Sequence, residues 1–178
     1  QAGKSSLYLQ GGDYIFKHCT FANYWSKGIR TESTVSLSNY YIDDDETEIT
    51  TPLNSADFIN CIISGTRSNE LFLDKNDNEP IFNFNLKNCL LDLEKGEDLY
   101  NTDDVNYYTN VLLKKDLDFR NTSINDLRIG LDNEGINQAD EITANQVPLD
   151  ILGTDRTTAP DIGAYQHIDF ETLEPSED

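Results

Sequence analysis

One short pattern of apolar and polar positions recurs along the chain: an apolar residue, any residue, Asn, one variable residue, then an apolar or aromatic residue. The clearest copy spans residues 58–63, and the next spans residues 86–91. The copy at residues 16–21 has His in place of Asn, and the copy at 37–41 has Tyr after the Asn. A fifth copy begins at Phe119. The key positions of the five copies are His18, Asn39, Asn60, Asn88 and Asn121.

The spacing of these positions predicts a solenoid. Successive key positions are 21, 21, 28 and 33 residues apart. One three-sided coil of short strands and turns takes about 21 residues, because a strand rises ~3.3 Å per residue. The longer intervals contain polar insertions at residues 74–80 and 94–110. We therefore predict an all-β fold, a right-handed parallel β-helix. The alternative is an ordinary β-sandwich with chance Asn–Cys pairs.

The chemistry of a coil corner explains the residue choices. Asn tolerates a left-handed backbone at a tight bend, and stacked Asn amides can hydrogen-bond one to the next. Cys19, Cys61 and Cys89 directly follow three of the key positions, as small buried residues would. We expect the five key positions to lie in register along one corner, ~4.8 Å apart at Cα, and the cysteines to be unpaired thiols.

The segment from Pro148 to Gln166 reads PLDILGTDRTTAPDIGAYQ. It resembles the closing segment of bacterial right-handed parallel β-helix proteins with a choice-of-anchor Q type C-terminal domain. Two positions depart from that pattern: Gln166 stands where the family has Glu, and residues 133–136 read NEGI where Ser-Pro-Ala-Ile is common. The matching positions are Asp150, Gly153, Arg156, Asp161, Ile162, Gly163, Ala164 and Tyr165.

The resemblance implies a C-terminal fragment of a protein that is secreted or attached to the bacterial cell surface or outer membrane. It implies no reaction, because this fold carries lyases, hydrolases and adhesins. Within one structural domain we expect β-helix coils over residues 1–124, a closing segment over 125–168 and an acidic tail over 169–178. The chain has no Met, and we expect missing N-terminal coils of a parent protein before an open first rung.

A structural role for the closing motif follows from its residue types. Arg156 and Asp161 flank a short turn, so we predict that Arg156 pairs with Asp161 or Asp150 and pins the last coil. Gly163 and Ala164 permit close backbone packing, and Tyr165 would cover apolar surface at the end of the helix.

Composition narrows the partners. The chain has 33 acidic and 13 basic residues, a net charge of −20, so nucleic-acid binding is not expected. The sequence contains no run of 18 apolar residues, so it predicts no membrane-spanning helix.

Candidate chemistry is sparse. Asp74, Asn76 and Asn78 alternate as in a calcium loop, but Glu79 stands where that loop has Gly, so a solvated turn is favoured. We therefore expect no cofactor, with calcium as the one candidate. Asn101–Asp104 (NTDD) resembles elements of polygalacturonase-like hydrolases without their flanked His. The acidic run from Asp43 to Glu48 reads as a solvated loop. Aromatic pairs suited to stacking on sugar rings are Tyr24–Trp25, Tyr40–Tyr41 and Tyr107–Tyr108.

Two functions remain open at this point. The first is a non-catalytic extracellular module that serves adhesion or contacts polysaccharide. The alternative is a polysaccharide lyase or glycoside hydrolase whose catalytic coils lie mainly upstream. No catalytic residues are assigned, since the chain has no cluster of carboxylates and a basic residue at coil spacing.

Overall fold

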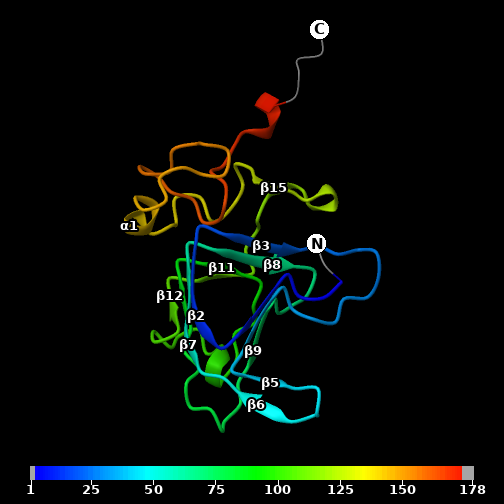
Figure 1. Ribbon diagram of the computed structural model, residues 1–178. Coiled ribbons are helices and arrows are strands. Elements are labelled where there is room, and N and C mark those ends of the chain that lie inside the picture. Colours follow the sequence, from blue (N-terminus) through cyan, green and yellow to red (C-terminus); the bar gives the residue numbers. More distant parts are fainter. Residues whose placement is uncertain (1–2, 174–178) are drawn as a thin grey trace.

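Three sheets of parallel strands hold most of the regular structure in the computed structural model, which describes residues 3–173 (Figure 1). The first sheet contains β1 (Leu7–Gln10), β4 (Val35–Ser38) and β9 (Leu71–Asp74). The second contains β2 (Gly12–Lys17), β7 (Leu53–Ile59), β10 (Asn85–Lys87) and β12 (Tyr108–Thr109). The third contains β3 (Thr20–Asn23), β8 (Ile62–Gly65), β11 (Leu90–Leu91) and β13 (Leu112–Leu113).

The chain visits the three sheets in turn, and we call one such traverse a pass. The first pass is β1–β2–β3, the second β4–β7–β8 and the third β9–β10–β11, while β12 and β13 belong to a fourth. Strands at equivalent positions of successive passes pair in parallel, except that β9 has no counterpart in the fourth pass within the described residues. The protein is therefore mostly β with parallel sheets, as the sequence predicts.

The main core lies between the three sheets. Register places Leu9, Leu37 and Leu73 beside one another in the first sheet, and Phe16 beside Phe58 in the second. The two phenylalanine rings stack with centroids 4.9 Å apart. Apolar residues at alternate strand positions thus form columns in the interior, which is what parallel pairing of in-register strands requires.

The cysteines belong to this core, and all three are free thiols. The Cys61 thiol donates to the carbonyl of Phe16, and the Cys89 thiol donates to the carbonyl of Phe58. Each buried thiol therefore bonds to the backbone of the preceding pass.

The predicted single corner of five residues is wrong in two positions. His18, Asn60 and Asn88 do share a corner, between the second and third sheets, and all have left-handed φ near 50–58°. Asn110, at φ 51°, occupies the same corner in the fourth pass. Asn39 instead follows β4, at the other end of β7 from Asn60.

Asn121 lies away from any corner. It ends β14 (Phe119–Asn121), which pairs antiparallel with β15 (Asp126–Ile129), and it caps the short helix η2 (Thr122–Ile124). The intervals along the true corner are 42, 28 and 22 residues. An antiparallel hairpin, β5 (Tyr40–Ile42) and β6 (Glu48–Thr50), lengthens the second pass, so that His18 and Asn60 are 42 residues apart. Asn39 lies midway between them in the sequence, which produced the two equal intervals of 21.

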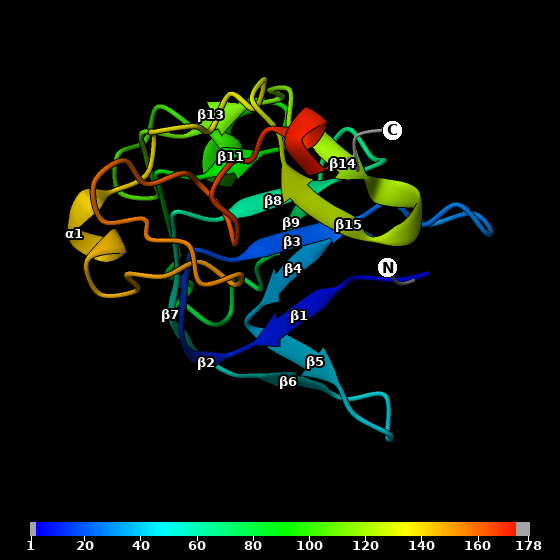
Figure 2. The ribbon, with the colours of Figure 1, turned by 90° about the horizontal axis from the view of Figure 1, so that it is seen from above.

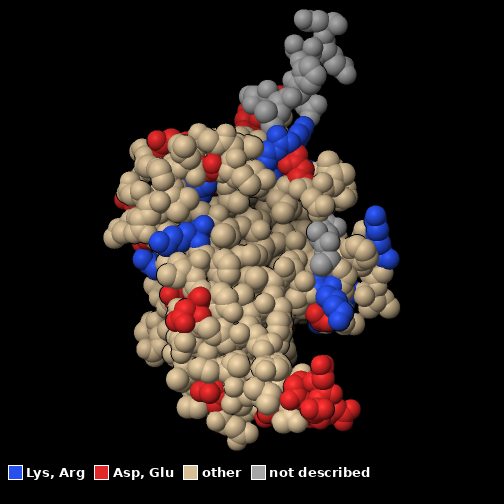
Figure 3. All heavy atoms as spheres, viewed as in Figure 1, with Lys and Arg blue, Asp and Glu red and all other residues tan. Residues whose placement is uncertain are grey.

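The hairpin carries the acidic run and projects from the first sheet (Figures 1 and 2). Figure 3 shows a concentrated acidic group over it, whereas other charges on that face form smaller separate groups. This distribution suits the solvated role that the sequence indicates for residues 43–48.

The polar insertion after Leu93 covers the interior at the fourth pass. Its short helix η1 (Asp98–Tyr100) packs Leu99 and Tyr100 against the core. The hydroxyl of Tyr100 accepts from the N–H of Leu73, and the hydroxyl of Tyr108 donates to the carbonyl of Leu99. The insertion therefore takes the place that a fourth strand of the first sheet would occupy.

The closing segment lies along the side of the sheets, which corrects the prediction that it seals the last coil. It contains β15, α1 (Glu141–Ala144) and the approach to η3 (Phe170–Leu173), and it passes over the third sheet (Figure 1). Ile62 and Leu90 point out of that sheet and pack against Leu117 and Ile162. Backbone N–H groups of residues 163 and 164 reach Asn60 and Thr20. The segment thus returns from the fourth pass to the first.

The first pass has open edges within the described residues. There, β1, β2 and β3 each stand at the end of their sheet, with a strand on one side only. Leu7, Phe16 and Phe21 pack on the core yet remain partly exposed. Of the acidic tail expected over 169–178, residues 170–173 form η3 and residues 174–178 lie outside the described residues.

Gly163 allows the closing segment to approach the third sheet. Its φ is +104°, and an added Cβ would lie 2.7 Å from Ile62 Cδ1 and 2.9 Å from Thr20 Oγ1. Gly153 has φ +86° with nothing within 4 Å of an added Cβ. We expect Gly153→Ala to lose about 1 kcal/mol of unfolding free energy from backbone strain alone.

Gly163→Ala should lose at least about 1 kcal/mol more than Gly153→Ala, because it combines the same strain with overpacking. Urea unfolding of the two variants measures the difference. Equal losses would show that the segment does not depend on close approach at Gly163.

Candidate functional site

A cleft of about 490 Å³ opens where the strands of the third sheet end. Tyr24 directly follows β3, Asp92 directly follows β11, and Lys115 comes two residues after β13. The opposite wall comes from the segment that leads into β14. The lining residues are Tyr24, Asp92, Lys115, Asp116, Leu117, Asp118, Phe119 and Thr122.

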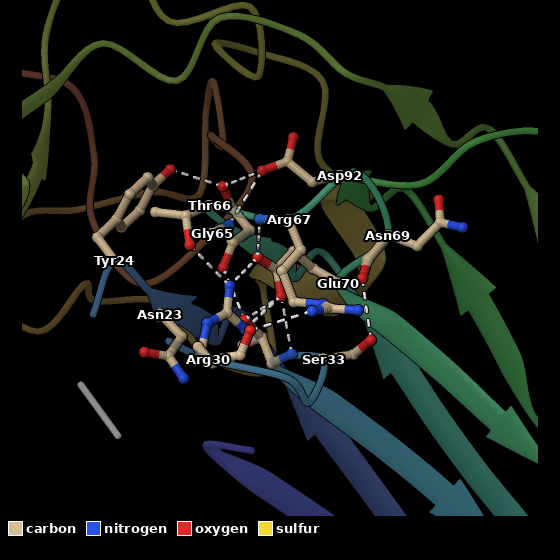
Figure 4. Close-up of polar contacts among 12 residues, drawn as sticks. Asn23, Tyr24, Arg30, Ser33, Gly65, Thr66, Arg67, Asn69, Glu70 and Asp92 are labelled. Atoms are coloured by element: carbon tan, nitrogen blue, oxygen red, sulfur yellow. Dashed lines mark hydrogen bonds and ion pairs between the residues drawn. The ribbon is translucent and has the colours of Figure 1, made fainter. Parts of the chain in front are cut away.

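A chain of hydroxyl groups forms one side of the cleft (Figure 4). The Tyr24 hydroxyl lies 2.7 Å from Ser64 Oγ, and the buried Ser64 hydroxyl donates to Asp92 Oδ2 at 2.5 Å. The N–H of Gly65 donates to the same carboxylate oxygen. Burial, the larger influence, raises the pKa of Tyr24. The phenol therefore keeps its proton at neutral pH and serves as a hydrogen-bond donor.

A buried ion pair lies on the other side of Gly65 from this chain (Figure 4). The guanidinium of Arg30 donates to both carboxylate oxygens of Glu70, and both side chains are almost fully buried. Glu70 also accepts from the N–H groups of Thr34 and Arg67. Since a buried carboxylate is stable only when its oxygens are satisfied, these contacts tie the two loops that link the third sheet to the first.

Gly65 separates the two polar groups. An added Cβ there would lie 2.2 Å from Glu70 Oε1 and 2.6 Å from the carbonyl oxygen of Asn23. Because a backbone oxygen cannot move aside, only glycine fits between Asp92 and Glu70.

A smaller hollow adjoins the cleft and shares Asp92 and Lys115 with it. The lysines at its rim are already paired: Lys114 Nζ lies 2.7 Å from Glu94, and Lys115 Nζ lies 2.8 Å from Glu134. Arg67 also lines this hollow, and its guanidinium donates to the carbonyl of Arg30, so the positive charge of this hollow comes from Arg67 rather than from the paired lysines.

Sequence reasoning identified one part of this cleft. Tyr24 belongs to an aromatic pair singled out for sugar stacking, whereas Asp92, Lys115 and Phe119 were missed. The expectation that no carboxylates cluster with a basic residue at coil spacing is wrong, because Asp92, Asp116, Asp118 and Lys115 line one cleft. Asp92 has a recognisable signal: it directly follows the Leu90–Leu91 strand pair, as Ser64 follows Ile62–Ile63. The other two pairs do not reach the cleft; Tyr40 and Tyr41 lie on the hairpin, and Tyr108 is buried in the core.

The corner residues hold the closing segment. Asn60 Oδ1 accepts from the N–H of Asp140 at 2.7 Å, and its Nδ2 donates to the carbonyl of Asp140 at 3.0 Å. Asn88 Nδ2 donates to the carbonyl of Gln138. The expected stacking of amide on amide is replaced by bonds from the corner to the closing segment.

His18 completes this corner as a neutral acceptor. Asn60 Nδ2 lies 2.8 Å from His18 Nε2 and can only donate, so Nε2 must be unprotonated. Burial, and next the positive charge of Arg156, lower the pKa of His18 to about 4. The corner is therefore built for an uncharged imidazole.

The expected pairing of Arg156 with an acid is wrong. Arg156 is buried, and its guanidinium donates to the carbonyls of Gly163 and Ala164 at 3.0 and 3.2 Å. Burial lowers the pKa of Arg156, while the charges of Asp150 and Asp161 oppose that shift from a distance. Arg156 binds the two carbonyls rather than the acids, because both carboxylates already accept hydrogen bonds from backbone N–H groups.

Those backbone contacts define the rest of the closing motif. Asp150 accepts from the N–H groups of Leu152, Thr154 and Gln166 in the turn that contains Gly153. Asp161 accepts from the N–H of Asn137, and from both the N–H and the ring Nδ1 of His167. Tyr165 is half-buried. The charged side chains of the motif thus hold the backbone of the closing segment in place through hydrogen bonds.

Within residues 3–173 no group of three or more His, Cys, Asp or Glu side chains could hold a metal ion. The calcium candidates make hydrogen bonds within the protein. The side chain of Asn39 instead binds the loop, accepting from the N–H of Asn76 and donating to its carbonyl. Asn76 Oδ1 caps the N–H of Asn78, and Asp74 accepts from the Tyr40 hydroxyl. In the NTDD segment, Asp103 pairs with Lys95.

Comparison with known proteins identified no relative: no protein-family model, no curated protein and no solved structure matches the chain. Within the part of the chain that the structure describes, no helix has the length and apolar character needed to cross a bilayer.

His18 predicts a loss of stability in acid. Its folded pKa of about 4 lies below the unfolded value of 6.5, so the stabilisation is complete above pH 6.5. It is lost as the pH falls toward 4, because the unfolded chain then binds a proton that the native corner rejects. Between pH 7 and 4.5 this costs about 2 kcal/mol.

His18→Asn supplies the matched control, since Asn occupies the corner in later passes and does not titrate. Urea unfolding at pH 7 and 4.5 should show a drop about 2 kcal/mol larger for the native chain than for the variant. Equal drops would contradict a neutral, buried His18.

Arg156 should matter for stability through its two carbonyl partners. Arg156→Ala leaves both carbonyls unpaired in a buried site, and we expect a loss of about 1–3 kcal/mol in thermal or urea unfolding. Arg120→Ala is the control, because its ion pair with Asp126 is partly exposed and should contribute about 0–1 kcal/mol. Similar losses for both variants would argue against the buried clasp.

Proposed function

We propose that the chain is a non-catalytic, glycan-contacting module at the C-terminal end of a right-handed parallel β-helix. Three parallel sheets visited in turn support the solenoid, and right-handed crossovers are the rule for parallel strands. The resemblance of residues 148–166 to choice-of-anchor Q type proteins supports a secreted or surface-attached bacterial parent. Neither the fold nor the motif identifies a reaction, so the function must be argued from the cleft.

The cleft at the ends of the third sheet is the observation that carries the proposal. It combines the rings of Tyr24 and Phe119 with a phenol hydroxyl and carboxylates. Pyranose rings present apolar C–H faces and polar hydroxyl edges, which suit aromatic walls and oriented acceptors respectively. The raised pKa of Tyr24 favours binding over proton abstraction, since an effective base would need a lowered pKa.

A catalytic parent is the second candidate, and the open first pass favours it. The outer edges of β1, β2 and β3 carry no partner strand within residues 3–173, and the aromatic column beneath them is partly exposed. Further passes could add to these edges in parallel and bring lyase or hydrolase residues with them.

Tyr24→Ala tests the module directly. In calorimetric titrations with oligosaccharides selected from a glycan array, the variant should bind at least about tenfold more weakly, or 1.4 kcal/mol. Tyr41→Ala is the matched control, because Tyr41 is an exposed tyrosine on the hairpin, and it should bind like the native chain. Melting curves exclude unfolding as the cause. Unchanged binding by Tyr24→Ala, or turnover of the same glycans, would contradict a non-catalytic site at this cleft.

A further inference from the structure

The cleft carries more acidic than basic side chains. Asp92, Asp116 and Asp118 line it, and Lys115 is the one cationic residue among its lining residues. The ammonium of Lys115 is itself 2.8 Å from the carboxylate of Glu134, so its charge is compensated from outside the cleft. The cleft therefore has a negative potential, and the net charge of −20 reinforces it.

The three carboxylates keep capacity to accept hydrogen bonds from a ligand. Asp92 uses Oδ2 for Ser64 and Gly65, and Asp116 uses Oδ1 for the N–H of Asp118. Asp118 uses Oδ2 for the N–H of Asp132. The second oxygen of each carboxylate makes no hydrogen bond within the described residues. Three acceptors thus remain for hydroxyl donors.

The aromatic rings give the cleft an apolar wall. Tyr24 and Phe119 meet edge to face, with centroids 6.0 Å apart and planes at 84°. Their arrangement is fixed from both sides: the Tyr24 hydroxyl is held by Ser64, and Phe119 packs against the cluster around Leu117 and Ile162. A rigid aromatic corner beside hydroxyl acceptors fits a sugar ring rather than an extended peptide.

We propose that this cleft binds an uncharged, hydroxyl-rich saccharide and discriminates against uronate or sulfated glycans. The inference rests on the proposed glycan-contacting function and adds the class of ligand. Sugar hydroxyls donate to carboxylates in charge-assisted bonds, which are the stronger kind of hydrogen bond. A sugar carboxylate or sulfate would instead enter a cleft lined by three carboxylates and one lysine that is already paired, and like charges repel.

The test compares hexasaccharides of equal length by calorimetry in low salt. The neutral probes are cello-, xylo- and mannohexaose, and the anionic probes are hexagalacturonate and an alginate hexasaccharide, each with and without calcium. We expect at least one neutral probe to bind about tenfold or more tightly than either anionic probe under both conditions, and Tyr24→Ala to abolish the preference. Added calcium reveals whether a bridging cation offsets the repulsion.

Asp116 provides the charge test because it is exposed at the cleft rim and its Asn replacement still caps the N–H of Asp118. Asp116→Asn and Asp116→Lys should raise the affinity for hexagalacturonate, relative to that for the neutral hexasaccharides, stepwise by about three- to tenfold per charge unit. The affinity for the neutral hexasaccharides should itself fall, because each variant removes one carboxylate acceptor. Asp44→Asn and Asp44→Lys make the same charge changes on the distant hairpin, where Asp44 is exposed, and should change neither affinity.

The outcomes separate the two proposals. If no probe binds, the glycan-contacting function fails and the inference with it. If an anionic probe binds as tightly as the neutral ones in either buffer, the function stands and the inference is overturned. If a neutral probe binds but Tyr24→Ala binds it equally well, the ligand lies elsewhere and the assignment of this cleft is wrong.

Discussion

The Asn60 corner is the interaction on which the arrangement of the rest depends. Asn60 has a left-handed backbone, with its N–H on the carbonyl of Lys87 and its own carbonyl on the N–H of Gly163. Its amide side chain grips the backbone of Asp140 through both atoms and also donates to His18. One buried residue therefore joins three passes to the closing segment, and every polar atom it buries is satisfied. A hydrophobic residue at the same bend would supply none of the side-chain bonds.

The third sheet is fixed by buried polar groups at both ends of its strands. At the start, the His18–Asn60 corner accommodates a neutral imidazole beside the Arg156 charge. At the far end, the Arg30–Glu70 pair fixes the loops that lead to the first sheet. The strands between are only two to four residues long and contribute few ladder bonds of their own. Such short strands hold their register because buried polar groups fix both of their ends.

The sequence predicted what is local and missed what depends on distant packing. Asn followed by Cys identifies a left-handed bend with a buried thiol after it, and three of the five predicted positions share one corner for that reason. Asn39 is followed by Tyr40 rather than Cys, its φ is not left-handed, and its side chain binds an insertion loop, so the cysteine marks the three residues that share the corner. The position of the closing segment beside the third sheet could have been predicted from the strands of that sheet. Adjacent apolar residues such as Ile62 and Ile63 predict a strand buried on both faces, and the outer face then needs a cover.

That cover also makes the candidate site. Leu117 lies at the wall of the cleft and is buried against Ile62, Leu90 and Ile162, so the closing segment and the wall share one apolar contact. Tyr24 and Asp92 come from the sheet itself, whereas Phe119 comes from the chain that leads into the closing segment. Neither part forms the cleft alone. Because the closing segment is clasped at the far corner by Asn60, tightness of that clasp controls how firmly the wall is held. If the cleft binds a glycan as proposed, residues of the closing motif influence that binding without touching the ligand, because they help to hold the wall in place.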